Sequence, residues 1–157
     1  MRPGRHAHIA IGGLTVSEAA DELDVFCTAE RLPDDAAWRL RVALDEIVAN
    51  IVAHSPHCPA ATGAAVDVWF CRDGAMVEVI VADDGPAFDP LARTGPDVSA
   101  PLEWRQPGGL GIALVKALMD EVRYERTSRN VLTIRKRLDA SPAAGAAGAD
   151  EHSPEQS

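Results

Sequence analysis

The feature that most constrains the fold is an apolar periodicity between residues 40 and 54. Branched aliphatic residues recur there at the three- and four-residue spacing of an α-helix: Leu40, Leu44, Ile47, Val48, Ile51 and Val52. A stripe this broad is typical of a helix packed against another layer. Glu46 and Asn50 are four residues apart, so they lie one above the other at the edge of the stripe. The pattern therefore predicts a buried helix with a carboxylate and an amide at its edge.

This Glu46–Asn50 pair has two interpretations. A carboxylate can accept a proton, and an amide oxygen can coordinate a hard cation such as Mg²⁺, so the pair could belong to a site. The same two residues are also typical of a solvated helix edge, which is the better interpretation of the pair taken alone. Other motifs in the chain have to decide between them.

The rest of the chain predicts an α/β fold of the α+β two-layer type, with helices on one face of a mixed, mostly antiparallel sheet. Apolar or alternating runs predict strands at residues 8–11, 65–72, 75–82, 122–126 and 131–137. Helices are predicted at about 17–31 and 112–119, and Asp73-Gly74 is a strong hairpin signal. Residues 1–138 are expected to form one domain. Residues 139–157, rich in Ala, Gly, Ser, Pro and acid, are expected to be a disordered tail.

Composition narrows the class of protein. The net charge is −9, and without the tail 20 acidic and 15 basic residues remain, so the basic footprint of a nucleic-acid-binding protein is missing. No apolar run is long enough for a membrane span or a signal peptide, so no membrane association and a cytoplasmic location are expected. His54, His57 and Cys58 lie close together, but prolines interrupt them and no second ligand pair follows, so a zinc site is disfavoured.

Two further motifs contain glycine. At the end of an apolar strand stands Asp83-Asp84-Gly85, where a buried Asp83 could accept a hydrogen bond from an exocyclic amine and Gly85 would let a planar group approach the backbone. At a helix start stands Gly109-Leu110-Gly111, where free N–H groups could point at a phosphate. Taken alone, the first motif could be an ordinary turn and the second a hinge. The second is neither a P-loop nor a Rossmann fingerprint.

In combination, the three motifs resemble the GHKL superfamily of ATPases and kinases. The order is Glu46 and Asn50 on a helix, Asp83-x-Gly85 at a strand end, a long proline-containing loop, and Gly109-x-Gly111 at a helix start. The likeness runs from about residue 8 to residue 138. Residues 108–112 and 118–122 are especially similar to the stand-alone bacterial anti-sigma factor serine/threonine-protein kinases.

The resemblance implies ATP and Mg²⁺ as cofactors and a role for each matching residue. Glu46 would be the general base, and Asn50 would hold the Mg²⁺ that bridges the phosphates. Asp83 would bind the adenine amine, and Gly85 would line the base pocket. The backbone of Gly109, Leu110 and Gly111 would meet the phosphates, and residues 86–107 would form the lid. A sigma factor and a STAS-domain anti-anti-sigma protein are the implied partners, with a homodimer as a further possibility.

Several positions depart from the family pattern. Ala87 stands where a second glycine is usual, and Val131 stands where a threonine is often found near the adenine, with Thr133 two residues further on. Arg93 and Arg105 fall in the expected lid, but no motif assigns them a role.

The main prediction is an ATP-dependent serine kinase that acts on a STAS-type protein, and the alternative is a nucleotide-dependent binding module with little or no turnover. The ATP-binding domain of a histidine kinase and a topoisomerase-like or chaperone-like ATPase fit less well, because the elements that they require are not found in this sequence.

Overall fold

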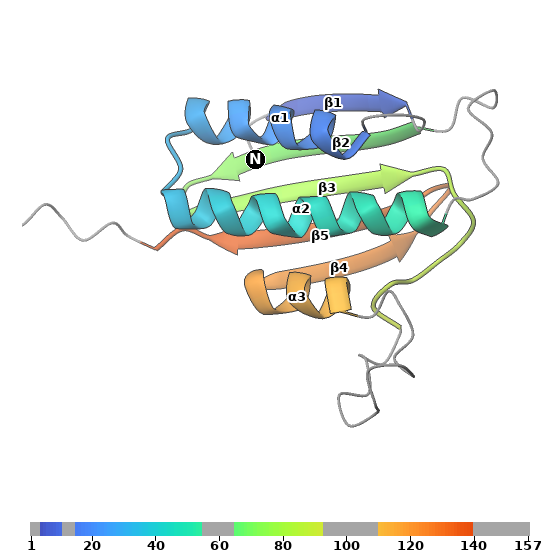
Figure 1. The fold of residues 1–157 in the computed structure, drawn as a ribbon. Coiled ribbons are helices and arrows are strands. Elements are labelled where there is room, and N and C mark those ends of the chain that lie inside the picture. The colour runs from blue at the N-terminus through green and yellow to red at the C-terminus, as the bar shows by residue number, and fades with distance from the viewer. Residues whose placement is uncertain (1–3, 11–14, 55–64, 93–109, 140–157) are drawn as a thin grey trace, which may run out of the picture.

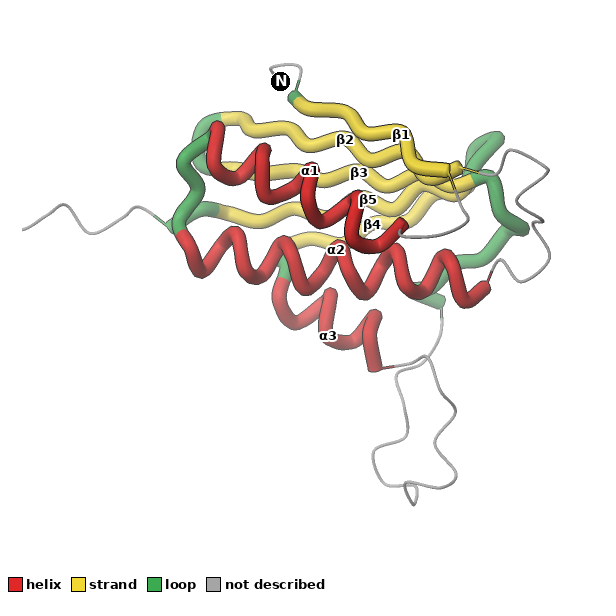
Figure 2. The backbone as a smooth tube through the Cα atoms, turned by 45° about the horizontal axis from the view of Figure 1, so that its top comes forward, coloured by secondary structure: helices red, strands yellow, loops and turns green. Residues whose placement is uncertain are grey.

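The computed structural model of the chain describes residues 4–10, 15–54, 65–92 and 110–139. They form one sheet covered on one face by helices (Figures 1 and 2). The strands are β1 (Arg5–Ala10), β2 (Ala65–Asp73), β3 (Met76–Asp83), β4 (Glu121–Arg126) and β5 (Asn130–Arg137). The helices are α1 (Thr15–Ala29), α2 (Asp34–His54) and α3 (Leu110–Leu118). The strand order is β1-β2-β3-β5-β4, and every pairing among these strands is antiparallel, which confirms the predicted fold class.

Several element boundaries differ from the sequence prediction by one to three residues, and the start of β1 and the end of α1 show the physical reasons. β1 begins at Arg5 rather than residue 8, because pairing with β2 extends it through Arg5, His6 and Ala7, which form no apolar run in the sequence. His6 stacks on Trp69 of β2, with ring centroids 4.8 Å apart. Helix α1 ends at Ala29 rather than residue 31, because Arg31 adopts a positive φ of 52° that leaves the helical conformation.

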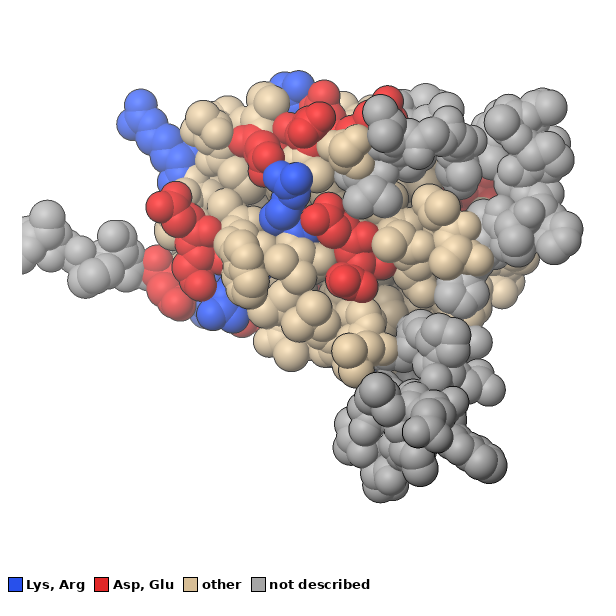
Figure 3. All heavy atoms as spheres, viewed as in Figure 1, with Lys and Arg blue, Asp and Glu red and all other residues tan. Residues whose placement is uncertain are grey.

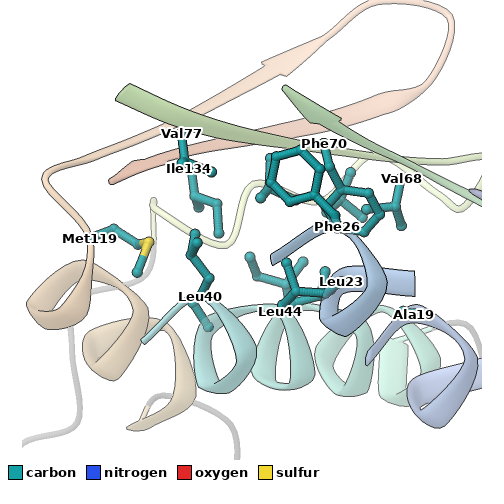
Figure 4. Packing of buried hydrophobic residues seen from close by; sticks show 14 of the residues in the cluster. Ala19, Leu23, Phe26, Leu40, Leu44, Val68, Phe70, Val77, Met119 and Ile134 are labelled. Carbon is teal, nitrogen blue, oxygen red and sulfur yellow. The ribbon is translucent and has the colours of Figure 1, made fainter. Parts of the chain in front are cut away.

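Helix α2 lies between α1 and α3 and packs on the centre of the sheet (Figure 1). The predicted stripe is largely confirmed, since Leu40, Leu44, Ile47 and Val48 are at most 1% exposed. Figure 4 shows Leu40 and Leu44 directed at the side chains of the sheet, among them Phe70 and Ile134. Each such leucine stabilises the fold by about 1.5–3 kcal/mol. The buried face thus fixes how α2 sits on the sheet and which edge it leaves open.

One residue of the stripe was predicted wrongly. Val52 is 41% exposed, because it follows the exposed Ala49 by three residues on the outer side of α2. Ala36 and Ala43 complete the buried face instead.

The sheet register determines where the chemistry-bearing residues meet. Asp83, the last residue of β3, pairs with Asn130, the first residue of β5. This end of the sheet lies beside the C-terminal half of α2 (Figure 1). No helix among the described residues is both long and apolar enough to cross a membrane.

Candidate functional site

A pocket of about 480 Å³, its open mouth included, lies between α2, the end of β3 and the start of β5. Its walls are largely aliphatic: Ile47, Ile51, Val81, Ile112 and Leu132. Its polar side chains are Asn50, Asp83, Tyr124 and Asn130, and the loop after β3 contributes Gly85, Pro86, Phe88 and Pro90. A largely apolar pocket with a few converging polar groups is typical of a small-molecule site.

Asp83 is 7% exposed and lines this pocket. Its Oδ1 accepts a hydrogen bond from the backbone N–H of Gly85 (2.8 Å) and another from Nδ2 of Asn130 (3.0 Å). Both hydrogen bonds that the structure shows for this carboxylate end on Oδ1. Oδ2 is therefore the oxygen left to accept a hydrogen bond from a ligand.

Asn130 is a site residue that the sequence did not reveal. It falls between the strands predicted at residues 122–126 and 131–137, a position typical of a turn, in which asparagine is common. In the structure it is 7% exposed, lines the pocket and is hydrogen-bonded to Asp83. Only the pairing of β5 with β3 brings the two side chains together, and no local pattern encodes that register.

The two other residues considered on this strand lie elsewhere. Leu132 and Ile134 of β5 point into the core, so the alternating residues Val131 and Thr133 face the opposite side of the sheet. Neither of them lines the pocket, and Asn130 is the residue of β5 that stands opposite Asp83.

Glu46 lies against the first turn of α3. A Cβ atom added to Gly111 would overlap Oε2 of Glu46, so a glycine at this position allows the carboxylate to approach the helix backbone. Glu46 is half-buried, and one turn further along α2 is Asn50, which lines the pocket. The positive end of the α3 dipole favours negative charge here, whether from Glu46 or from a ligand. The helix edge and the glycine motif of the sequence are thus neighbours in the fold.

Of the predicted site residues, Asn50, Asp83 and Gly85 line the pocket, and Glu46 and Gly111 contact each other beside it. Leu110 is the first residue of α3 and is 67% exposed. Gly109 lies outside the described residues, as do Arg93, Arg105 and most of the predicted lid.

Two arginines tie the loop after β3 to the β4–β5 turn. Arg126 donates to the carbonyl oxygen of Gly85 at 3.1 Å. Arg129 forms ion pairs with Asp84 and Asp67, both at 2.7 Å, and also donates to the carbonyl oxygen of Ala82. Burial acts to lower the pKa of Arg129, but the hydrogen bond that Arg129 donates to Asp67 and the charge of Asp84 raise this pKa overall. These bonds fix the loop after β3 against the β4–β5 turn.

The described residues contain no cluster of three or more His, Cys, Asp or Glu side chains that could bind a metal ion. The disfavoured zinc arrangement depends on the side chains of His54, His57 and Cys58, which lie outside the part of the chain that the structure describes.

Comparison with known proteins identifies the family. Residues 14–136 match the model of the histidine kinase-like ATPase domain. The chain belongs to this family. The resemblance stated from the sequence motifs is thereby confirmed.

Curated relatives include the serine-protein kinase RsbW of Halalkalibacterium halodurans, 31% identical over 140 residues, which cover 87% of this chain and 80% of that protein. RsbW of Bacillus subtilis is 30% identical over 141 residues, covering 87% and 82% of the two chains. The serine/threonine-protein kinase BtrW of Bordetella bronchiseptica is 28% identical over 120 residues, covering 75% and 82%.

A solved structure with the same fold contains the RsbU and RsbW domains of Rv1364c from Mycobacterium tuberculosis. The TM-score is 0.57 at 19% identity, and the match covers 87% of this chain and 33% of that one.

Proposed function

We propose that this chain is an ATP-dependent protein serine kinase and anti-sigma factor whose substrate is a STAS-type anti-anti-sigma protein. Relatives that share 28–31% of its residues over most of both chains are named serine or serine/threonine kinases. The observation that carries the proposal is Asp83, a buried carboxylate that lines a largely apolar pocket and has one oxygen left to accept a hydrogen bond from a ligand.

In this proposal the adenine enters the aliphatic part of the pocket, where Val81 and Leu132 are among the residues that line it. Its exocyclic amine donates to Asp83, and Gly85, which has no side chain, lets the base approach the backbone. The phosphates extend toward Asn50 and the start of α3, where the backbone of Gly109, Leu110 and Gly111 would meet them.

Asn50 fits a role as the protein ligand of Mg²⁺. This ion commonly takes only one or two protein ligands and keeps several waters, so a single amide oxygen beside the phosphates is sufficient. Bound Mg²⁺ would neutralise charge on the phosphates during transfer. Glu46 lies one turn away on the same helix, where it would accept the proton of the attacking serine hydroxyl.

The charges on the helical face fit a protein partner better than nucleic acid. Acidic side chains gather over α1 and the adjoining part of α2 (Figure 3), and Arg41 lies among them, paired with Asp24 and Asp45. Such a surface lacks the basic footprint that the phosphates of nucleic acid require. The sigma factor as a second partner, a homodimer, a cytoplasmic location and a disordered tail after residue 138 stay predictions.

The first experiment is calorimetric titration with ATP and with ADP, with and without Mg²⁺. Asp83→Asn removes the negative charge of the carboxylate. ATP affinity should therefore fall at least about tenfold, which is the loss expected when a hydrogen bond to a charged group is removed. Asp84→Asn makes the same chemical change one residue along, at an exposed position paired with Arg129, and should bind ATP nearly as the wild type does. Wild-type protein that is folded and binds no nucleotide would refute the kinase proposal.

A second experiment separates the kinase from the binding module. Phosphate transfer from ATP is measured on a panel of purified STAS-domain proteins, with wild type and Glu46→Ala. Transfer by the wild type that is lost in Glu46→Ala, with ATP binding retained, supports the kinase. Nucleotide-dependent binding of a STAS protein without transfer by the wild type would instead favour the binding module.

A further inference from the structure

The amide of Asn130 is held in one orientation by its hydrogen-bond partners. Its Oδ1 accepts from Arg126 at 2.9 Å and from the hydroxyl of Tyr124 at 2.8 Å. Its Nδ2 donates to Oδ1 of Asp83 and to the carbonyl oxygen of Pro86, both at 3.0 Å. A guanidinium can only donate, and a carbonyl oxygen can only accept. Rotating the amide by half a turn would therefore place donor against donor and acceptor against acceptor.

This fixed orientation has a direct consequence for Asp83. Oδ1 of Asp83 receives one N–H from the Gly85 backbone and one from Asn130, which holds the carboxylate at two points. The carboxylate cannot rotate to offer a different atom without breaking at least one of these bonds. Both residues are 7% exposed, so water competes weakly for them. Oδ2 is left as the available acceptor of a carboxylate that is held in one orientation.

We infer that Asn130 is a positioning residue that sets the selectivity of the pocket for a 6-amino over a 6-oxo purine nucleotide. The inference rests on the proposed nucleotide site. A 6-amino group donates to Oδ2 of Asp83, whereas a 6-oxo group would place its own oxygen against that carboxylate. The discrimination depends on Asp83 staying in place, because a mobile carboxylate could turn away from the 6-oxo group.

The support for Asn130 comes from the edge strand β4. Both Tyr124 and Arg126 belong to this strand, and Arg126 also donates to the carbonyl oxygen of Gly85. The charged groups around the amide are thus Asp83 from β3 and Arg126 from β4, while Asp84 is paired with Arg129. Removing the guanidinium of Arg126 should loosen Asn130 without adding a charge beside Asp83.

The test compares ATP with ITP, which differ in the group at position 6 of the base, by calorimetry on wild type and Asn130→Asp. The substitution keeps the shape of the side chain but replaces the donating amide with a second carboxylate next to Asp83. At pH 8, ATP affinity should fall about tenfold to a hundredfold, and the preference for ATP over ITP should narrow. Two carboxyl groups this close share one proton at lower pH, which restores a donor to Asp83.

ATP affinity of Asn130→Asp should therefore recover toward the wild-type value between pH 8 and about pH 5.5, with wild type measured at each pH as reference. A role confined to stability would not produce recovery in acid. Thr133→Val, on the same strand but on the other face of the sheet, serves as the matched control and should leave both affinities unchanged. Arg126→Met is the second variant, and it should narrow the ATP-over-ITP preference a few-fold with no acid recovery.

Each outcome tells the two proposals apart. If the wild type binds ATP but Asn130→Asp keeps both its ATP affinity and its preference over ITP, the role of Asn130 is refuted and the nucleotide site stands. Loss of ATP binding at every pH, or an equal loss in Thr133→Val, also refutes positioning through Asp83. If Asn130→Asp does not fold, an unchanged ATP-over-ITP preference in Arg126→Met overturns the inference. A folded wild type that binds neither nucleotide refutes the proposed function itself.

Discussion

Replacing Gly111 with alanine should separate the stability of this protein from its activity. Gly111 is the second residue of α3, and an added Cβ would overlap Oε2 of Glu46. The next atoms of that side chain are at ordinary contact distances from the added Cβ, 3.4 Å for Cδ and 3.8 Å for the Glu46 Cβ. Only the carboxylate end of a flexible side chain therefore has to move.

The expected effect on stability is small and favourable. Alanine is preferred over glycine in a helix by about 0.5–1 kcal/mol, and turning the half-buried Glu46 away offsets part of that gain. The free energy of unfolding should stay the same or rise by up to about 1 kcal/mol, which corresponds to at most about 4 °C in Tm for a chain of this length. Backbone N–H groups of α3 are unchanged, so ATP affinity should change by no more than about threefold.

Activity should fall even though the fold is intact. The proposed role of Glu46 is that of a general base, which contributes about 10²–10⁴-fold to a proton-transfer step when positioned, so its displacement should slow phosphate transfer at least about tenfold. The assay is single-turnover transfer to the STAS-domain protein that the wild type phosphorylates best, with a thermal melt of the same sample.

Gly74→Ala is the matched control, because it should lower stability and leave phosphate transfer unchanged. Gly74 has a φ of 58° in the β2–β3 turn, and nothing lies within 4 Å of an added Cβ, so only backbone strain of about 1–2 kcal/mol is introduced. Its Tm should fall while transfer is unchanged. Wild-type transfer by Gly111→Ala would refute the idea that the carboxylate works from its place against α3.

Two further predictions concern titratable groups away from the pocket. Burial raises the pKa of Asp45, with Arg41 opposing the shift, and Oδ1 of Asp45 is buried without a hydrogen-bond partner in the described structure. A folded-state pKa above the unfolded value means that ionised Asp45 disfavours folding at neutral pH. Asp45→Asn should therefore raise the free energy of unfolding at pH 7 by less than about 1 kcal/mol. This gain should disappear below about pH 3, where Asp45 of the wild type is also uncharged. Urea denaturation of wild type and variant at both pH values measures the difference. Burial also raises the pKa of the Cys27 thiol to about 11. In the native protein at pH 8, iodoacetamide should therefore modify the partly exposed Cys71 well before the buried Cys27. Peptide mass mapping detects this difference in rate, and unfolding in urea should abolish it.

The elements of this fold follow from local patterns in the sequence. Leu40, Leu44 and Ile47 repeat at helical spacing, and the structure buries all three. Asp73-Gly74 predicts a hairpin turn, and Gly74 adopts the positive φ that such a turn needs. Patterns of this kind can be read from sequence because the periodicity of a helix and the conformation of a turn depend on residues close together in the chain.

Part of the site could be predicted for the same reason. Glu46 and Asn50 share one helix, and Asp83 and Gly85 lie in one short segment, so their relation to each other is local. The contact between Glu46 and Gly111 joins α2 to α3, which are distant in sequence, and it appears only when both helices pack on the sheet.

Asn130 shows most clearly what only the tertiary structure decided. Its sequence neighbours indicate a turn, and two other residues of the same strand, Val131 and Thr133, were considered for the base pocket. A shift of one residue in strand register exchanges the two faces of a sheet, and the register follows from the packing of the whole core. The sequence by itself therefore determined the candidate residues whose relation is local, and the pairing of β3 with β5 decided that Asn130 is the residue that holds Asp83.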